Sequence, residues 1–182
     1  MKNTKMLFVI ILSLLAGEAV YAQKFAGLDA SPADIAYLRE NGRRSTAVAK
    51  ITYGRPQKKG RTMLGGTEPF GKVWRLGANE TTEIKLFRDV TFGDKLVKAG
   101  TYSLYAIPNE KEWTIIFNSK LDTWGPYEYD ESKDVVRFSV PATKSDTELE
   151  AFSIAFDEAN GTGASNLWIG WETTLVKIPL KF

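Results

Sequence analysis

Carboxylate, arginine and asparagine side chains are the groups in this chain of 182 residues that could do chemistry. The sequence holds 22 acidic and 24 basic residues but no histidine and no cysteine. Catalysis by an imidazole base or a thiolate is therefore excluded, and a zinc site would need oxygen ligands alone, which is rare. The sequence also lacks a phosphate-binding glycine loop and a dinucleotide fingerprint. We expect neither a cofactor nor a metal.

Pairs of carboxylates are the remaining catalytic possibility. Two carboxyl groups about 5 to 9.5 Å apart can hydrolyse a glycosidic bond. The acids that the sequence places in turns are Glu80, Asp122, Glu128 and Glu172. Because a chain with so many acids brings some carboxylates together by chance, solvated surface charge is the simpler explanation for them. A carboxylate-dependent hydrolase acting on carbohydrate is the alternative function.

A binding function needs fewer groups, since aromatic rings can face sugars while arginine and asparagine bind hydroxyl and carboxylate groups. The longest irregular segment, SKLDTWGPYEYDESK, places Trp124, Tyr127 and Tyr129 among acids. Long loops on rigid scaffolds often carry function. These rings could form a stacking surface, or Trp124 could pack inward as the anchor of the loop. The ligand-binding candidates are Arg55, Arg61, Arg75, Asn79, Glu80, Asn118 and Trp124.

The stretch GKVWRLGANETTEI contains three of these candidates around an expected turn. Strand alternation followed by a tight turn explains its tryptophan, glycine and asparagine, and the turn suits a left-handed conformation at Asn79. These requirements do not explain Arg75. Arg75 could form an ion pair with Glu80 or Glu83 that holds the turn, or it could bind an anion or a carboxylate.

Short alternating or apolar runs separated by turn residues predict strands through most of the chain. The expected strands are 47–53, 73–76, 82–87, 95–97, 101–107, 113–118, 134–140, 149–156, 166–171 and 174–180. This pattern predicts an all-β, single-domain antiparallel β-sandwich, jelly-roll-like or a partly closed barrel, with at most one short N-terminal helix. Strands in such a sandwich would bring polar groups in turns together at one end.

Turn residues predict how some of these strands are joined. Segments 98–100 and 108–111 are expected to close hairpins. Runs 167–171 and 175–180 are expected to form a closing hairpin, with Pro179 marking the second run as an edge strand.

The first residues have the features of a signal peptide, with lysines at the start, a short apolar run and small residues before a cleavage point after Ala22. Without a cysteine for lipid attachment, we expect a soluble periplasmic or secreted protein with no membrane span after cleavage. The expected domains are the signal peptide at 1–22, an N-terminal lead-in at 23–45 and the β-sandwich at 46–182. In the lead-in, Ser31-Pro32 could begin a short helix that stops at Gly42, or it could turn an extended segment.

The formal net charge of +2 is too small to indicate a nucleic-acid partner. Because the chain has no cysteine, its stability must rest on packing, with aromatic side chains supplying much of the buried area. A possible glycan or cell-envelope component is the expected partner, and the oligomeric state stays open.

Several motifs follow one another along the chain: Tyr53-Gly-Arg-Pro56, Lys59-Gly-Arg61, Trp74-Arg-Leu-Gly-Ala-Asn-Glu80, Ala99-Gly-Thr-Tyr102, Ile107-Pro108, Trp113-Thr-Ile-Ile116, Asn118, Asp122-Thr-Trp-Gly125, Asp134-Val-Val-Arg137 and Trp171-Glu172. Together they resemble the family known as domain of unknown function 2911. The resemblance covers nearly all of the chain after the signal peptide. It implies an exported bacterial protein, and it implies no known reaction, ligand or catalytic residue. The expected function is therefore the non-enzymatic binding of a small polar ligand, glycan or cell-envelope partner.

Overall fold

A computed structural model describes residues 24–182, so the expected signal peptide lies outside the described residues. The described chain forms one open, nine-stranded antiparallel sheet with the order β1-β2-β3-β6-β7-β8-β9-β4-β5. The strands are β1 (Ala33–Arg39), β2 (Ala47–Gly54), β3 (Thr82–Leu86), β4 (Val90–Phe92), β5 (Lys95–Val97), β6 (Gly100–Ile107), β7 (Glu112–Asn118), β8 (Asp134–Phe156) and β9 (Ala164–Lys181). A single 3₁₀ turn, Glu131–Lys133, precedes β8. Residues 24–182 include no helix long and apolar enough to cross a membrane.

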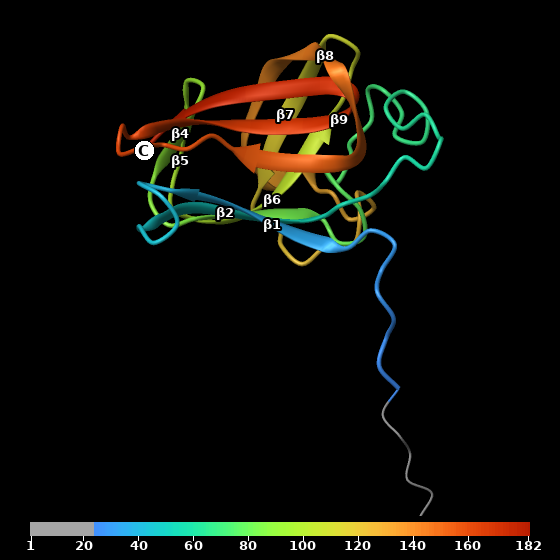
Figure 1. Cartoon of the computed structure of the whole chain (residues 1–182), viewed down its shortest axis with the longest axis horizontal. Helices are drawn as coiled ribbons and strands as arrows, with labels where there is room; N and C mark the ends of the chain where they lie inside the picture. The colour runs from blue at the N-terminus through green and yellow to red at the C-terminus, as the bar shows by residue number, and fades with distance from the viewer. Residues whose placement is uncertain (1–23) are drawn as a thin grey trace, which may run out of the picture.

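The sheet folds over on itself because β8 is long enough to belong to two layers. Its first part, up to Pro141, pairs with β7, and its second part, from Ala142, pairs with β9. Figure 1 shows the result, with β1 and β2 in one layer and β9 in the other. The prediction of an all-β antiparallel fold is confirmed. The sheet is not a closed barrel, because β1 and β5 remain edge strands.

The expected closing hairpin is wrong, because both of its runs belong to the single strand β9. Extra residues on β8 face fewer residues on β9 near Leu149, and such bulges bend a strand without ending it. Glu172 adopts a left-handed φ of 53° at this bend. β9 lies between β8 and β4, so Pro179 does not mark an edge strand. Pairing with β8 ends at Val176, before the proline.

The lead-in segment forms a strand, so the expected short helix is wrong. β1 pairs along its whole length with β2, with Leu38 buried while Ile35 and Tyr37 are exposed. The edge of β2 offers hydrogen-bond partners that a helix would leave unused, and the sequence pattern cannot show this long-range pairing. The alternative of an extended segment is confirmed.

Of the two short hairpins expected at 98–100 and 108–111, one is present and one is absent, and the strand expected at 73–76 is also absent. Segment 108–111 joins β6 to β7 as the expected hairpin. Segment 98–100 does not close a hairpin, because β5 pairs with β4 whereas β6 pairs with β3 and β7. Segment 73–76 is not a strand, since only Trp74 makes an isolated bridge, to Ala106. Both expectations failed because the pairing partners of these segments lie far away in the sequence.

The core between the layers is built on aromatic rings. Trp74 stacks on Trp171 at 5.7 Å between ring centroids and meets Trp113 edge-on at 5.9 Å. Phe152 packs edge-on against Trp74 at 5.1 Å and also against Tyr53 at 5.7 Å. These five side chains come from β2, β7, β8, β9 and the segment before β3, so they join both layers. Their burial supplies the stability that this cysteine-free chain needs.

Candidate functional site

The turn before β3 lies in backbone contact with the end of β2. The amide of Ala78 donates to the carbonyl oxygen of Gly54 at 3.3 Å. A Cβ atom placed on Gly54 would lie 2.0 Å from the carbonyl oxygen of Ala78, and one on Gly77 would lie 2.8 Å from the carbonyl oxygen of Gly54. Only glycine allows the two segments to approach this closely. The turn is therefore held at a defined position beside the sheet.

Two residues of this turn, Leu76 and Asn79, have left-handed φ values of 53° and 62°. The expected left-handed conformation at Asn79 is confirmed. A left-handed backbone is unusual at a leucine, and the hydroxyl of Thr82 stabilises it by donating to the carbonyl oxygen of Leu76 at 2.6 Å. Asn79 donates its side-chain amide to Asp29 at 3.1 Å and to the carbonyl oxygen of Ser31 at 3.4 Å.

A surface hollow of about 250 Å³ opens between this turn, the start of β1 and the loop after β7. Most of the side chains around it carry oxygen: hydroxyl, carboxylate or amide. The lining residues are Ser31, Ala33, Thr52, Tyr53, Gly54, Asn79, Glu80, Thr81, Glu83, Asp122 and Thr123. The hollow therefore offers many hydrogen-bond acceptors in a small space.

A buried hydroxyl network holds the floor of the hollow. The hydroxyls of Thr81 and Thr123 lie 2.8 Å apart, and the Tyr105 hydroxyl lies 2.9 Å from that of Thr123. Thr81 also donates to the carbonyl oxygen of Gly125 at 3.1 Å. Because the buried hydroxyls bind one another, the floor is rigid and the carboxylates at the rim are the groups available to a ligand.

Three carboxylates line the hollow: Glu80 from the turn before β3, Glu83 from β3 itself, and Asp122 from the loop after β7. Burial raises the pKa of the Glu83 carboxyl above its usual value, the charge of Asp122 raises it further, and Lys50 opposes both effects. The hollow is thus an acidic site in which like charges act on one another. Among the described residues, no group of three or more acids is arranged to hold a metal ion.

Replacing Glu83 by glutamine is expected to raise the melting temperature at pH 7 by about 1–2 °C. Because its folded-state pKa is raised, ionised Glu83 costs stability, and this cost grows as the pH rises from the usual carboxyl pKa of the unfolded state to the raised pKa of the folded state, above which it is constant. The advantage of Glu83→Gln should therefore vanish below about pH 4, where the carboxyl is protonated in both states. Melting curves across about pH 3–8 measure it, with the exposed Glu110→Gln as the control. A constant difference at every pH would contradict the explanation.

A family model described as a protein of unknown function (DUF2911) matches residues 37–180. The chain belongs to this family. No curated protein and no solved structure matches it. Membership of this family does not indicate a reaction or a ligand. The geometry of this DUF2911 chain is what indicates the roles of its individual residues.

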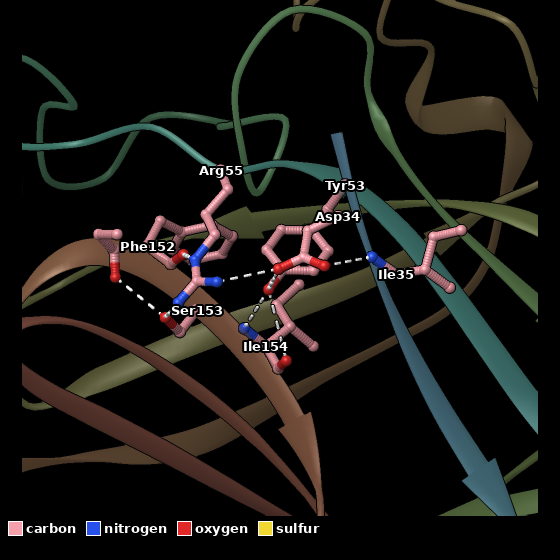
Figure 2. A network of polar contacts seen from close by, with 8 residues as sticks. Asp34, Ile35, Tyr53, Arg55, Phe152, Ser153 and Ile154 are labelled. Carbon is pink, nitrogen blue, oxygen red and sulfur yellow. Dashed lines mark hydrogen bonds and ion pairs between the residues drawn. The ribbon is translucent and has the colours of Figure 1, made fainter. Parts of the chain in front are cut away.

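Arg55 of this DUF2911 chain is bound within the protein (Figure 2). Its guanidinium donates to Asp34 at 3.0 Å, to the carbonyl oxygen of Phe152 at 3.2 Å and to the hydroxyl of Ser153 at 3.0 Å. Beside it, the amide of Ile154 donates to the hydroxyl of Tyr53 at 3.1 Å. These contacts tie β1 and β2 to β8 across the open side of the sheet. Arg55 therefore has a structural role in closing the two layers.

The side chains of Asn118 and Arg61 are also hydrogen-bonded to nearby residues of the chain. The amide of Asn118 donates to the Asp134 carboxylate at 2.8 Å, and its oxygen accepts the amide of Lys120 at 2.9 Å. Arg61 donates to the carbonyl oxygen of Lys58 at 2.9 Å within its own loop. Neither residue lines the hollow. The structure therefore does not bring all seven candidates together.

Two of the four acids proposed for catalysis have other contacts. Glu172 accepts the backbone amides of Met63 and Leu64 at 2.9 and 3.0 Å, so it holds the loop after β2. Glu128 pairs with Lys120 at 3.4 Å. The other two, Glu80 and Asp122, line the hollow.

The loop after β7 is anchored by Tyr129, not by Trp124. Tyr129 packs edge-on against Tyr105 at 5.0 Å and donates to Asp134 at 2.7 Å. Trp124 is 55% exposed and Tyr127 is 82% exposed, so the expected inward packing of Trp124 is wrong. Trp124 bridges Glu80 through the backbone, and directly opposite residues in an antiparallel pair carry their side chains on the same face. An exposed indole therefore lies beside the carboxylate at the rim.

Sequence reasoning gave Glu83 no place in the site beyond a possible pairing with Arg75. Strand alternation offered a usable signal, because Thr82 and Ile84 are buried in β3 and Glu83 must then point to the opposite face. The threonine hydroxyls of the hollow carried no comparable signal. Arg75, finally, forms an ion pair with neither Glu80 nor Glu83.

Proposed function

We propose that this DUF2911 protein is a non-enzymatic binding protein that takes a polyhydroxylated ligand, such as the end of a glycan or of a cell-envelope component, into the hollow. The proposal includes export to the periplasm or the cell exterior, which rests on the sequence of the signal peptide. The observation that carries it is the meeting of Glu80, Glu83 and Asp122 in one hydroxyl-rich hollow with the exposed ring of Trp124 beside it.

The chemistry of these groups suits a sugar. Carboxylates accept hydrogen bonds only, and a sugar presents several hydroxyl donors at neighbouring positions. Hydrogen bonds to charged groups are stronger than those between neutral groups. An indole ring offers a flat apolar face to the C–H face of a sugar ring. An anionic ligand would be repelled from this hollow, so a neutral ligand is the better fit.

Calorimetric titration and thermal shift of the purified protein against neutral oligosaccharides of bacterial envelopes test this proposal. A ligand that binds the folded state raises the melting temperature as its concentration exceeds the dissociation constant. We expect a saturable shift with at least one neutral glycan. If no glycan among a broad neutral panel binds at millimolar concentration, the proposal fails.

Glu80→Gln and Asp122→Asn should each weaken this binding by about tenfold to a hundredfold, since a hydrogen bond to a charged group contributes about 1.5–3 kcal/mol. Titration of each variant with the same glycan measures the loss. Trp124→Ala should weaken binding through the lost stacking surface while leaving the fold intact, because the ring is largely exposed. Glu110→Gln, which removes an exposed charge away from the hollow, is the matched control and should bind normally.

A carboxylate-dependent hydrolase is the second candidate, favoured by Glu83 and Asp122. An acid with a raised pKa beside a second carboxylate is the arrangement of a general acid and its partner. Release of new reducing ends from a bound oligosaccharide, lost in both Glu83→Gln and Asp122→Asn, would favour the hydrolase. Stable binding without release over a day would favour the binding protein.

A further inference from the structure

We propose that Arg75 forms a second ligand site, separate from the lining of the hollow, which binds the carboxylate of an organic acid. The site consists of the guanidinium of Arg75, the backbone of Gly125 that passes over it and the exposed ring of Tyr127. It does not depend on sugar binding in the hollow. It takes anionic ligands, whereas the hollow takes neutral ones.

The guanidinium of Arg75 lacks the partners that comparable arginines have. Its Nε atom is buried and has no hydrogen-bond partner among residues 24–182. Nor does Arg75 form an ion pair with any acid in this range. Two other partly buried arginines, Arg39 and Arg55, donate to a carbonyl oxygen or a carboxylate. A partly desolvated cation without a counter-ion is unfavourable, and an incoming carboxylate would remove that cost.

The loop after β7 leaves room for the guanidinium by means of a glycine. A Cβ atom on Gly125 would lie 3.0 Å from Nη1 of Arg75 and 3.1 Å from the ring of Tyr127. Gly125 also has a left-handed φ of 66°. Its carbonyl oxygen accepts the hydroxyl of Thr81 at 3.1 Å, so this acceptor already has a donor. The loop thus covers the arginine with backbone without neutralising its charge.

One acid lies close enough to act on Arg75 through its charge but does not contact it. Burial raises the pKa of the partly buried Glu68 carboxyl, and the charge of Arg75 opposes this rise. The two side chains nevertheless form no ion pair. Glu68 therefore contributes a negative charge that competes with an incoming carboxylate from a distance, without itself pairing with the guanidinium.

A carboxylate matches the guanidinium better than other small groups do. Arginine presents its donors in a planar fork that binds the two oxygens of a carboxylate together, whereas lysine offers a single charged point. The exposed ring of Tyr127 lies beside Gly125 and borders the site. Arg75→Lys should therefore keep the charge and lose most of the affinity.

Two-dimensional NMR of the ¹⁵N-labelled protein tests the site through the Nε–H resonance of Arg75, assigned by its absence in Arg75→Lys. The probes are galacturonate, galactose and N-acetylalanine, titrated to tens of millimolar. We expect galacturonate, N-acetylalanine or both to shift this resonance and galactose to leave it unchanged. A response to galacturonate alone indicates a sugar acid as the ligand, and a response to N-acetylalanine alone indicates a peptide carboxyl terminus.

Variants separate this site from the hollow. Arg75→Gln and Arg75→Lys should each weaken carboxylate binding at least tenfold, with melting temperatures no lower than that of the natural chain, whereas the exposed Arg44→Gln should not weaken it. Glu68→Gln should strengthen it about threefold by removing the competing charge. Equal responses to galacturonate and galactose, or full carboxylate affinity in Arg75→Gln, would overturn the proposal. Loss of neutral-glycan binding in Glu80→Gln concerns only the hollow and leaves this inference standing.

Discussion

Gly54→Ala is expected to abolish native folding or to destabilise the protein by more than about 4 kcal/mol. The added Cβ would lie 2.0 Å from the carbonyl oxygen of Ala78, and its nearest neighbours are all backbone atoms. A clash with a flexible side chain can be relieved by rotation, but backbone can yield only if the turn before β3 moves. That movement would also break the hydrogen bond from Ala78 to Gly54. Circular dichroism and urea unfolding measure the effect.

Two other glycines provide controls for Gly54→Ala. Gly27→Ala adds the same methyl group where no atom lies within 4 Å, so no change is expected. Gly42→Ala adds it in open space at a φ of 69°, which isolates the backbone cost of about 1 kcal/mol. If Gly54→Ala unfolds at the same urea concentration as Gly42→Ala, the close approach of the two segments does not exist in solution.

Trp74→Ala is expected to destabilise the protein by about 3–5 kcal/mol, the range for removing a large buried aromatic side chain. Trp74 is 2% exposed and contacts the rings of Trp113, Phe152 and Trp171. Its indole nitrogen also donates to the carbonyl oxygen of Gly77 at 3.1 Å, so its loss leaves a cavity and an unsatisfied carbonyl. Urea unfolding with a constant m-value measures the change in the free energy of unfolding.

Trp124→Ala is the matched control, since it removes the same side chain from a position that is 55% exposed. We expect its free energy of unfolding to stay within about 0.5–1 kcal/mol of that of the natural chain. A comparable loss of stability in both variants would contradict the assignment of Trp74 to the core and of Trp124 to the surface. Trp74→Ala should also weaken ligand binding, because Trp74 holds the turn that carries Asn79 and Glu80.

Strands with clear alternation or a short apolar run between turn residues were predictable, because both patterns can be read from neighbouring residues in the sequence. β2, β3, β6 and β7 appear close to their expected positions. The short strand β4 was missed, and the helical alternative for β1 failed. Both are strands because other strands lie beside them, and local composition carries little information about that.

In the candidate site, too, local sequence predicted the turn residues but not the contacts between distant segments. Asn79 and Glu80 were predictable as turn residues, and the structure places both at the hollow. Arg55 and Asn118 looked equally suited to a ligand, but each has partners within the chain. Residue type shows what a side chain can bind, and only its neighbours in space show whether those bonds are already made.

The sequence by itself determined the all-β class and excluded histidine and cysteine chemistry, because period-two alternation and residue types are properties of the chain alone. Only the tertiary structure decided that Glu83 of β3 meets Asp122 after β7, and that the buried Nε of Arg75 has no hydrogen-bond partner in the described chain. The physical reason is that alternation shows which face a side chain occupies, whereas strand pairing depends on contacts between residues far apart in sequence. Those pairings determine which charges meet and which are left without a partner.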